Sequence, residues 1–244
     1  MHEIRTEPNK PPVNIRPYRL PEIHKETIQK EVDKMLTEGT VSPSNSPWNG
    51  PLLVVPKKPG EDGEKRWRVV VDFRKLNEIT IADAYPLPNI EDILGQLGNS
   101  KYFSTLDLAS GFHQIQVSPS DKAKTAFSTV QGHYEFNRMP FGLRNAPPTF
   151  QRLMNQVLSG LQGIKCLVYL DDIIIYGKNL QDHNEKLISV LNNLQNHNLK
   201  LQPEKCKFLH TEVMYLGHVI SNEGTKPDPG KIDSIQNICA HKLI

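Results

Sequence analysis

The segment CLVYLDDIIIYG, residues 166–177, sets two adjacent carboxylates between apolar runs that would otherwise be predicted as one buried strand. Aspartate tolerates turn dihedral angles and bonds to its own backbone, so Asp171-Asp172 can be a tight hairpin turn. Two neighbouring carboxylates also repel each other, and in a partly buried place one should take up a proton unless a cation compensates. The segment therefore leaves two interpretations open: an ordinary turn, or a site for a divalent metal ion.

A third carboxylate lies on another predicted strand, KYFSTLDL, residues 101–108. Side chains alternate along a strand, so Phe103, Thr105 and Asp107 share one face. At a turn, Asp171 and Asp172 can both point to one rim, and Asp107 would complete a set of oxygen ligands for Mg²⁺. Three such carboxylates can hold two metal ions about 3.5–4 Å apart for an in-line phosphoryl displacement, which predicts nucleotidyl transfer.

The rest of the chain alternates predicted helices and strands without a repeat of fixed period. Helical spacing of apolar residues, with proline or glycine at the ends, predicts helices within residues 22–40, 88–98, 147–161 and 182–199. β-rich runs predict strands within residues 51–58, 65–74, 112–118, 124–130 and 133–139, and a strand pair within 206–221. The proline-dotted segment 8–21 favours an extended arm. Together they predict an α+β fold with helices packed on a largely antiparallel sheet.

Composition limits the class of protein. The 244 residues are 37% hydrophobic with a formal net charge of +2, enough to bury a substantial core but without a whole-molecule field that indicates a nucleic-acid partner. Three scattered cysteines form no CxxC pair, and no apolar run approaches the roughly 20 residues that span a bilayer. The charged N-terminus lacks the apolar core of a signal peptide. We expect an intracellular, cytoplasmic chain with no membrane partner and no zinc site.

Six strings occur in order along the sequence, and together they resemble the reverse transcriptases of gypsy-type long-terminal-repeat retrotransposon polyproteins. They are SPWNGPLLVVPKK, WRVVVDFRKLN, LDLASGFHQI, MPFGLRNAPPTFQRLMN, YLDD and YLGHVIS. The resemblance runs over about residues 2–238. It implies an RNA-directed DNA polymerase that adds deoxynucleotides to a primer on an RNA or DNA template, with Mg²⁺ or Mn²⁺ as cofactor.

The same resemblance implies a right-hand polymerase fold. Its expected divisions are an N-terminal arm over 1–20, fingers over 21–84 and 115–144, a palm over 85–114 and 145–222, and the start of a thumb over 223–244. The thumb is expected to be essentially missing, which favours weak and strongly salt-sensitive nucleic-acid binding.

Site residues follow by match to the family's motifs. Asp107 and Asp171 are expected to be the principal catalytic metal ligands, with Asp172 beside them. Phe112 matches the aromatic residue that excludes a ribose 2′-hydroxyl, with core packing as the alternative. Arg68 matches the fingers arginine that grips the triphosphate, and its planar fork suits bidentate phosphate contacts.

The remaining expected residues form two groups. Those expected at the nucleotide are Lys57, Lys58, Ser110, Gly111 and Phe141, the last standing where retroviral enzymes have glutamine. Those expected at template or primer are Tyr169, Leu170, Tyr215, Leu216, Gly217, Asp72 and Arg74. For Asp72 and Arg74, bracing of the fingers is the alternative, and for Tyr169 it is ordinary strand packing. Residues 214–221 resemble the primer-grip hairpin.

Two other functions compete with polymerization. One is a truncated or co-opted retrotransposon fragment that binds nucleic acid without efficient synthesis; the presence of all three carboxylates favours the polymerase. The other is a nucleotide cyclase on a similar palm, which the fingers and primer-grip motifs disfavour because they serve a polymer substrate. Other products of the same polyprotein, within a virus-like particle, are further expected partners.

Overall fold

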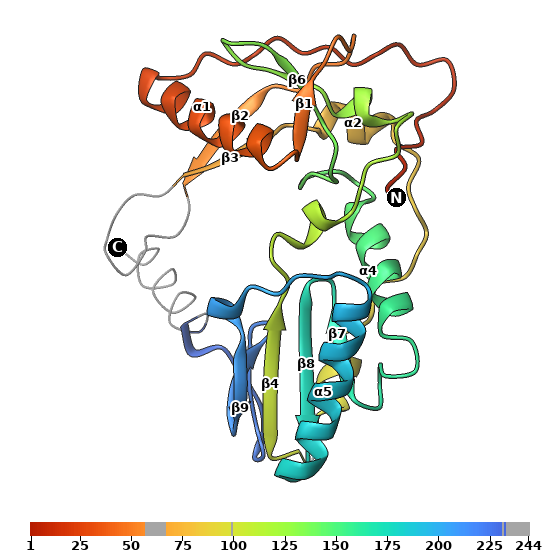
Figure 1. Cartoon of the computed structure of the whole chain (residues 1–244), viewed down its shortest axis with the longest axis vertical. Helices are drawn as coiled ribbons and strands as arrows, with labels where there is room; N and C mark the ends of the chain where they lie inside the picture. Colours follow the sequence, from red (N-terminus) through yellow and green to blue (C-terminus); the bar gives the residue numbers. More distant parts are fainter. Residues whose placement is uncertain (57–66, 99, 231, 233–244) are drawn as a thin grey trace, which may run out of the picture. The chain divides into compact units, whose positions relative to one another are not determined.

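The computed structural model describes residues 1–56, 67–98, 100–230 and 232 (Figure 1). The chain divides into two compact units. The first combines Met1–Ala84 with Phe112–Thr149, and the second combines Tyr85–Gly111 with Phe150–Ile244. Each unit is therefore built from two separate stretches of sequence.

The first unit has two small antiparallel sheets and one long helix. The helix, α1 (Glu22–Thr37), ends before Gly39, whose φ of 68° suits glycine, and packs against β1 (Val41–Pro43) and β3 (Trp67–Val71). The three-stranded sheet has the order β1, β6 (His133–Phe136), β5 (Phe127–Ser128). Strand β2 (Leu52–Pro56) pairs with β3 as the predicted hairpin, whose turn lies outside the described residues. Helix α2 (Arg74–Ile79) and two 3-10 helices, η1 (Gly111–Gln114) and η2 (Lys122–Thr125), complete the regular structure around these sheets.

Aromatic side chains form much of the core of the first unit. The fully buried Phe127 ring lies 5.3 Å from that of Phe136, which in turn lies 6.5 Å from that of Phe73. The N-terminal segment joins this core, because Ile4 is buried and its N–H donates to the Asp121 carboxylate at 3.0 Å. The N-terminal arm is thus anchored at its beginning.

A four-stranded antiparallel sheet is the centre of the second unit (Figure 1). Its strand order is β7 (Cys166–Tyr169), β8 (Asp172–Gly177), β4 (Tyr102–Asp107), β9 (Lys207–His210). Helix α5 (Leu180–Asn196) covers one face of β8 and β4. A second sheet has the order β10 (Glu212–Tyr215), β11 (His218–Ser221), β12 (Gly224–Pro227). Further helices in the described part of this unit are α3 (Ile90–Gly95), η3 (Pro203–Lys205) and most of α4 (Ala146–Val157).

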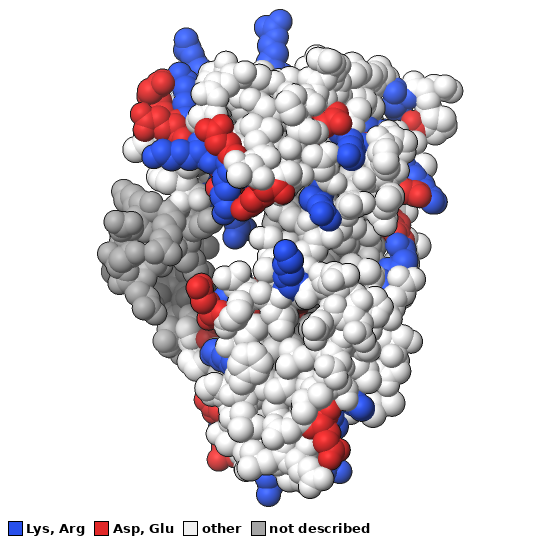
Figure 2. All heavy atoms as spheres, in the orientation of Figure 1, with Lys and Arg blue, Asp and Glu red and all other residues white. Residues whose placement is uncertain are grey.

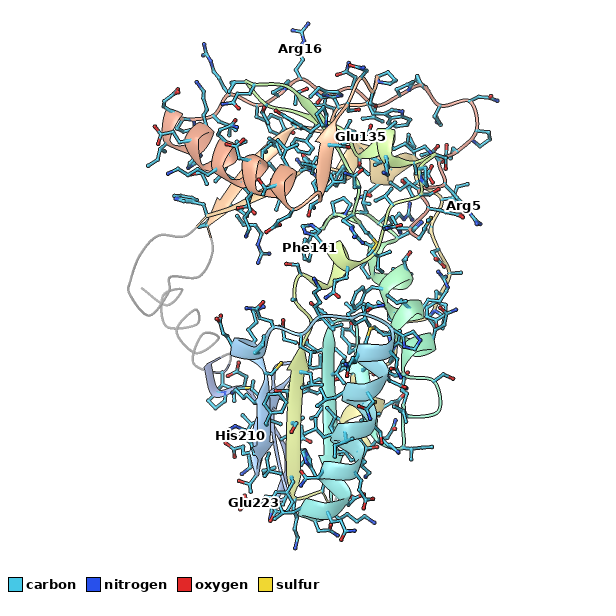
Figure 3. All side chains as sticks on the ribbon, in the orientation of Figure 1. Arg5, Arg16, Glu135, Phe141, His210 and Glu223 are labelled. Atoms are coloured by element: carbon cyan, nitrogen blue, oxygen red, sulfur yellow. The ribbon has the colours of Figure 1, made fainter. Side chains whose placement is uncertain are left out.

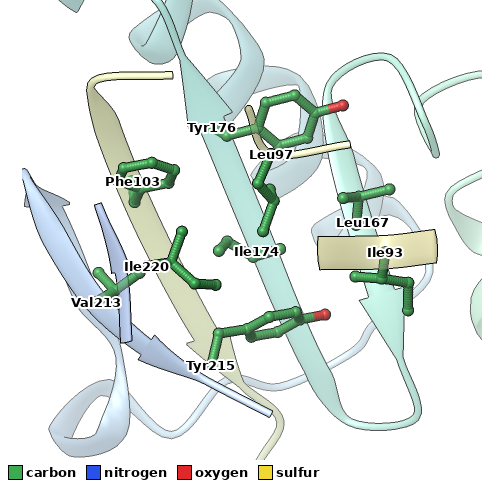
Figure 4. Close-up of a cluster of buried hydrophobic side chains, with 9 residues drawn as sticks. All are labelled: Ile93, Leu97, Phe103, Leu167, Ile174, Tyr176, Val213, Tyr215 and Ile220. Carbon is green, nitrogen blue, oxygen red and sulfur yellow. The ribbon is translucent and has the colours of Figure 1, made fainter. Parts of the chain in front are cut away.

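The opposite face of the four-stranded sheet carries an apolar cluster (Figure 4). Strand alternation sends Ile173 and Ile175 to one face of β8, and Ile174 and Tyr176 to the other. The members of the cluster, all 9% exposed or less, are Ile93, Leu97, Phe103, Leu167, Ile174, Tyr176, Val213, Tyr215 and Ile220. This core fixes β4 and β8 side by side; β4 ends at Asp107, and β8 begins at Asp172.

Several sequence-based predictions need correction. The strand predicted within 112–118 is wrong, because η1 occupies its start and the Ile115 N–H turns back to the Phe112 carbonyl at 3.1 Å. In the strand predicted within 124–130, only Phe127–Ser128 is a strand. Thr125 Oγ1 donates to the Lys122 carbonyl and accepts from the Phe136 N–H, so these side-chain hydrogen bonds replace strand pairing there. Residues 206–221 hold three strands rather than two. The sequence reading missed β1, α2 and β12.

Surface charges are mixed in sign on the visible face of the first unit (Figure 2). Helix α1 shows the same pattern in detail, since Lys25 pairs with Glu22 and Lys34 with Glu38. In the described part of the chain, no helix combines the length and the apolar character needed to cross a membrane.

Candidate functional site

The first feature of the site is the register between β4 and β8. Their antiparallel pairing sets Asp107 directly opposite Asp172, and Asp172 is also the partner of Tyr169 on β7. Directly paired residues share a face of the sheet, so the two carboxylates lie side by side at one end of it. The structure thus brings together acids that are 65 residues apart in the sequence.

The third carboxylate, Asp171, lies in the turn that joins β7 to β8. The two turn residues are Leu170 and Asp171, so the turn begins one residue earlier than predicted and Asp172 already belongs to β8. Leu170 has a φ of 55°, a left-handed conformation that costs a non-glycine residue about 1–2 kcal/mol. Its N–H donates to Gln151 Oε1 at 2.8 Å, and a net contribution of about 1 kcal/mol from such a bond offsets much of this strain.

Gly111 allows the backbone after β4 to approach Asp171 closely. A Cβ added at Gly111 would lie 3.2 Å from the Asp171 Cβ and 3.0 Å from the Phe150 ring. Either separation is tighter than ordinary van der Waals contact, so a larger residue here would push against the turn. The residues after Asp107 and the turn that carries Asp171 are therefore in direct contact.

The electrostatics of the site reflect this crowding of acids. Loss of hydration first, and then the charges of Asp171 and Asp107, raise the pKa of Asp172 to about 6, although part of its surface is exposed. Lys205 acts in the opposite direction. Its Nζ lies 3.3 Å from both carboxylate oxygens of Asp107. A positive charge is thus already held where the acids meet.

Lys205 reaches Asp107 because the segment after α5 crosses the end of β4. The Gln202 N–H donates to the Asp107 carbonyl at 2.9 Å, and the Ala109 N–H donates to the Lys200 carbonyl at the same distance. Nothing in the sequence around PEK, residues 203–205, indicated this role, because it depends on a pairing between distant segments.

The donor set suits a hard divalent cation, since Mg²⁺ prefers carboxylate oxygens and its charge would offset the repulsion that raises the Asp172 pKa. Among the residues that the structure describes, however, no three His, Cys, Asp or Glu side chains form a ready-made metal cage. The strands bring the carboxylates together, and binding would require their side chains to reorient, with Lys205 leaving Asp107.

Most residues expected at the nucleotide lie in the first unit. Phe112 stacks on Phe141 with ring centroids 5.0 Å apart, and Phe141, on the segment between β6 and α4, is 45% exposed (Figure 3). Arg68 is exposed on β3. Lys57 and Lys58 fall outside the described residues. In the second unit, Ser110 is exposed with a φ of 48°, next to the buried Gly111.

Asp72 and Arg74 form a brace inside the first unit. The Arg74 guanidinium donates to Asp72 Oδ2 at 2.6 Å and Oδ1 at 2.9 Å, and Tyr18 Oη donates to Oδ2 at 3.2 Å. These hydrogen bonds, with that from Arg74 first, lower the pKa of the buried Asp72 carboxyl to about 2. The geometry agrees with the bracing alternative for Asp72.

The expected primer-grip residues form a tight hairpin turn between β10 and β11. Leu216 and Gly217 both have positive φ, 49° and 75°, as a two-residue type I′ turn requires. The Tyr215 ring is buried in the apolar cluster (Figure 4), and its hydroxyl donates to the Asp172 carbonyl at 3.2 Å. The side chain of Tyr215 therefore supports the carboxylate strand, and the turn residues Leu216 and Gly217 are partly buried.

The similarity of this chain to known proteins covers the regions that carry the site residues described above. A family model described as "Reverse transcriptase (RNA-dependent DNA polymerase)" matches residues 55–220, more than half of the chain. The chain belongs to the reverse transcriptase family. The matched range contains β4, the β7–β8 hairpin and, except for its last residue, the hairpin that resembles the primer grip.

Relatives confirm the gypsy-type resemblance of this reverse transcriptase chain. It is 50% identical over 96% of its length to the retrovirus-related Pol polyprotein from transposon 297 of Drosophila melanogaster, and 45% identical over 98% of its length to that from transposon gypsy. It spans 22% and 24% of those two polyproteins.

Solved structures confirm the predicted fold class. The foamy viral protease-reverse transcriptase in complex with an RNA/DNA hybrid matches 97% of this chain with a TM-score of 0.84 and 29% identity, over 31% of its own length. The same protein in complex with dsDNA gives a TM-score of 0.82 over 96% of this chain and 49% of that one, at 28% identity.

Proposed function

We propose that this chain is the polymerase core of an RNA-directed DNA polymerase, which adds deoxynucleotides to a primer 3′-hydroxyl by two-metal-ion nucleotidyl transfer. One observation supports this most: in a chain of this family, Asp107 and Asp172 are paired across two strands, with Asp171 in the adjoining turn. An ordinary hairpin turn would not need a third acid placed opposite it.

In this proposal Asp107 and Asp171 are the principal ligands of Mg²⁺ or Mn²⁺, and Asp172 assists beside them. The bound ions would lower the pKa of the attacking 3′-hydroxyl and stabilise the charge of the leaving pyrophosphate. The protein's own contribution is to hold the carboxylates at one place, on strands fixed by the apolar cluster of Figure 4.

The nucleotide and nucleic-acid contacts are proposed from the same match. Arg68, with Lys57 or Lys58, would bind the triphosphate, and backbone amides near Ser110 would assist. Phe112 would exclude a 2′-hydroxyl. The division of the chain into fingers and palm is also part of this proposal. The presence of two separate compact units in the structure supports such a division.

A template with primer is the proposed macromolecular partner. The foamy viral protease-reverse transcriptase, which has a similar fold, is in complex with an RNA/DNA hybrid in one solved structure and with dsDNA in another. In this chain the turn at Leu216 and Gly217 and the residues Tyr169 and Leu170 would face the primer.

Primer extension by the full chain tests the proposal. We expect extension of a DNA primer on an RNA template with Mg²⁺ or Mn²⁺, and its loss in Asp171→Asn. Asp92→Asn is the matched control, because Asp92 is an exposed aspartate of the same unit on α3. Absence of extension by folded wild-type chain with either metal would refute polymerization and favour a fragment that binds nucleic acid without synthesis.

A further inference from the structure

A partly buried chain of hydrogen-bonded polar side chains leads from α4 to the turn that carries Asp171. Gln151 is fully buried, and its Oε1 accepts the Leu170 N–H at 2.8 Å. Its Nε2 donates to Asn155 Oδ1 at 2.9 Å, one helical turn along α4. Asn155 Nδ2 donates to Tyr85 Oη at 2.6 Å. All four residues belong to the second unit.

This relay determines which way the Gln151 carboxamide faces. Because the Leu170 N–H can only donate, Gln151 must present its oxygen to it; Nε2 then faces Asn155 Oδ1, and Asn155 Nδ2 faces Tyr85 Oη. Buried polar groups in such networks polarise one another and are costly to leave unpaired. Loss of Gln151 would therefore leave a backbone donor without its partner at the point where the turn is strained.

The hydrogen bond from the Leu170 N–H to Gln151 stabilises the residue of the turn that has the strained conformation. Leu170 adopts the left-handed conformation at a φ of 55°, where a leucine side chain gives no local support. The next residue is Asp171, whose direction depends on the dihedral angles of Leu170. On its other side Asp171 is confined by Gly111, so the relay and the glycine hold the turn from two directions.

We propose that Gln151 is a positioning residue: through the Leu170 N–H it fixes the turn so that the Asp171 carboxylate faces the metal-binding place. Asn155 acts behind it by accepting the hydrogen bond from Nε2, and Tyr85 by accepting one from Asn155. This inference rests on the proposed function, because Asp171 matters as a metal ligand only if the site binds metal. Residues that hold metal ligands in place typically change metal affinity by about 10–100-fold when removed.

Substitutions on α4 test the relay in the full chain. Gln151→Met keeps size and burial but removes the acceptor, so the Leu170 amide should exchange with solvent at least about tenfold faster. Asn155→Leu should have a smaller effect of the same kind. Asn155→Asp still accepts from Gln151 and can accept from Tyr85, so it should behave like wild type. Gln156→Met, on the exposed side of the same helix, is the matched control.

Two measurements separate positioning from mere stability: amide exchange at Leu170 by NMR, and Mn²⁺ affinity by electron paramagnetic resonance without nucleotide. We expect Gln151→Met to weaken Mn²⁺ binding about tenfold and Asn155→Asp to leave it unchanged. Unchanged exchange at Leu170, or faster exchange with unchanged Mn²⁺ affinity, overturns the inference. A wild-type chain that binds no Mn²⁺ instead overturns the proposed function and, with it, the positioning role. If Gln151→Met does not fold, Asn155→Leu against Asn155→Asp carries the same comparison.

Discussion

Replacement of Asp72 by asparagine tests whether the Tyr18–Asp72–Arg74 brace stabilises the first unit. The change removes the negative charge while keeping a similar shape. A carboxyl whose pKa is held at about 2 instead of 3.8 corresponds to about 2 kcal/mol of folding free energy at neutral pH. Arg74 is 77% exposed, so solvent screening reduces the expected loss to about 1–2 kcal/mol.

The sign of the pH dependence follows from the direction of the shift. The folded pKa of Asp72 is lowered, so its contribution is present above pH 4 and is lost as the pH falls from about 4 towards 2. The difference in stability between wild type and Asp72→Asn should therefore be full at pH 7 and smaller at pH 3.

Tryptophan fluorescence is a suitable assay because both tryptophans of the chain, Trp48 and Trp67, belong to the first unit. We expect the thermal midpoint of Asp72→Asn to fall by roughly 3–6 °C at pH 7. Glu78→Gln is the matched control: it breaks the exposed pair with Lys75 on α2 and should change stability by less than about 0.5 kcal/mol.

Equal stability of Asp72→Asn and Glu78→Gln would refute the brace. If that result came with weaker binding of an RNA template, the template alternative for Asp72 would replace it. A loss of stability that stayed constant between pH 7 and pH 3 would mean that the lowered carboxyl pKa is not its cause.

Three further predictions concern the second unit and the nucleotide. Lys205→Met should tighten Mn²⁺ binding about threefold to tenfold by removing a cation that competes for Asp107, whereas Lys205→Arg should not. The gain in Mn²⁺ affinity should vanish in an Asp107→Asn background, and an unchanged affinity of Lys205→Met would contradict the competition. Ile174→Ala, at a fully buried site, should cost about 2–5 kcal/mol in urea unfolding followed by circular dichroism, whereas Ile188→Ala, at a 59% exposed site on α5, should cost far less. Phe112→Ala should raise ribonucleotide incorporation relative to deoxynucleotide incorporation in primer extension. An unchanged ratio would favour the packing role of Phe112, which stacks on Phe141.

The sequence predicts the centre of the second unit because strands β4 and β8 are consistently patterned. The apolar runs on both sides of the aspartates predict buried strands, and the structure has strands there. The predicted alternation, with Phe103 and Asp107 on one face of β4, agrees with the observed pairing of β4 with β8. The helical stripe of α4 was visible for the same reason. Local pattern and tertiary structure agree wherever an element buries one whole face.

Short elements of the first unit could not be predicted from local sequence patterns. Strand β1 has three residues and forms only because β6 lies beside it, so its three letters carry no period. The 3-10 helix η1 begins at a glycine in contact with Asp171, a contact between segments 60 residues apart. Single-sequence patterns describe neighbours along the chain, whereas these elements depend on neighbours in space.

The one-residue error at the central turn shows how much of the site depends on such neighbours. Turn chemistry alone places the turn at Asp171-Asp172, because aspartate tolerates turn dihedral angles better than leucine does. In the structure Leu170 takes the left-handed position instead, held by Gln151, and Asp172 becomes the first residue of β8. A shift of one residue exchanges the two faces of a strand, so the predicted turn would have removed Asp172 from its pairing with Asp107. The core of the second unit and the buried Gln151 therefore set the strand register that brings the carboxylates together. The turn preference of the two aspartates does not set it.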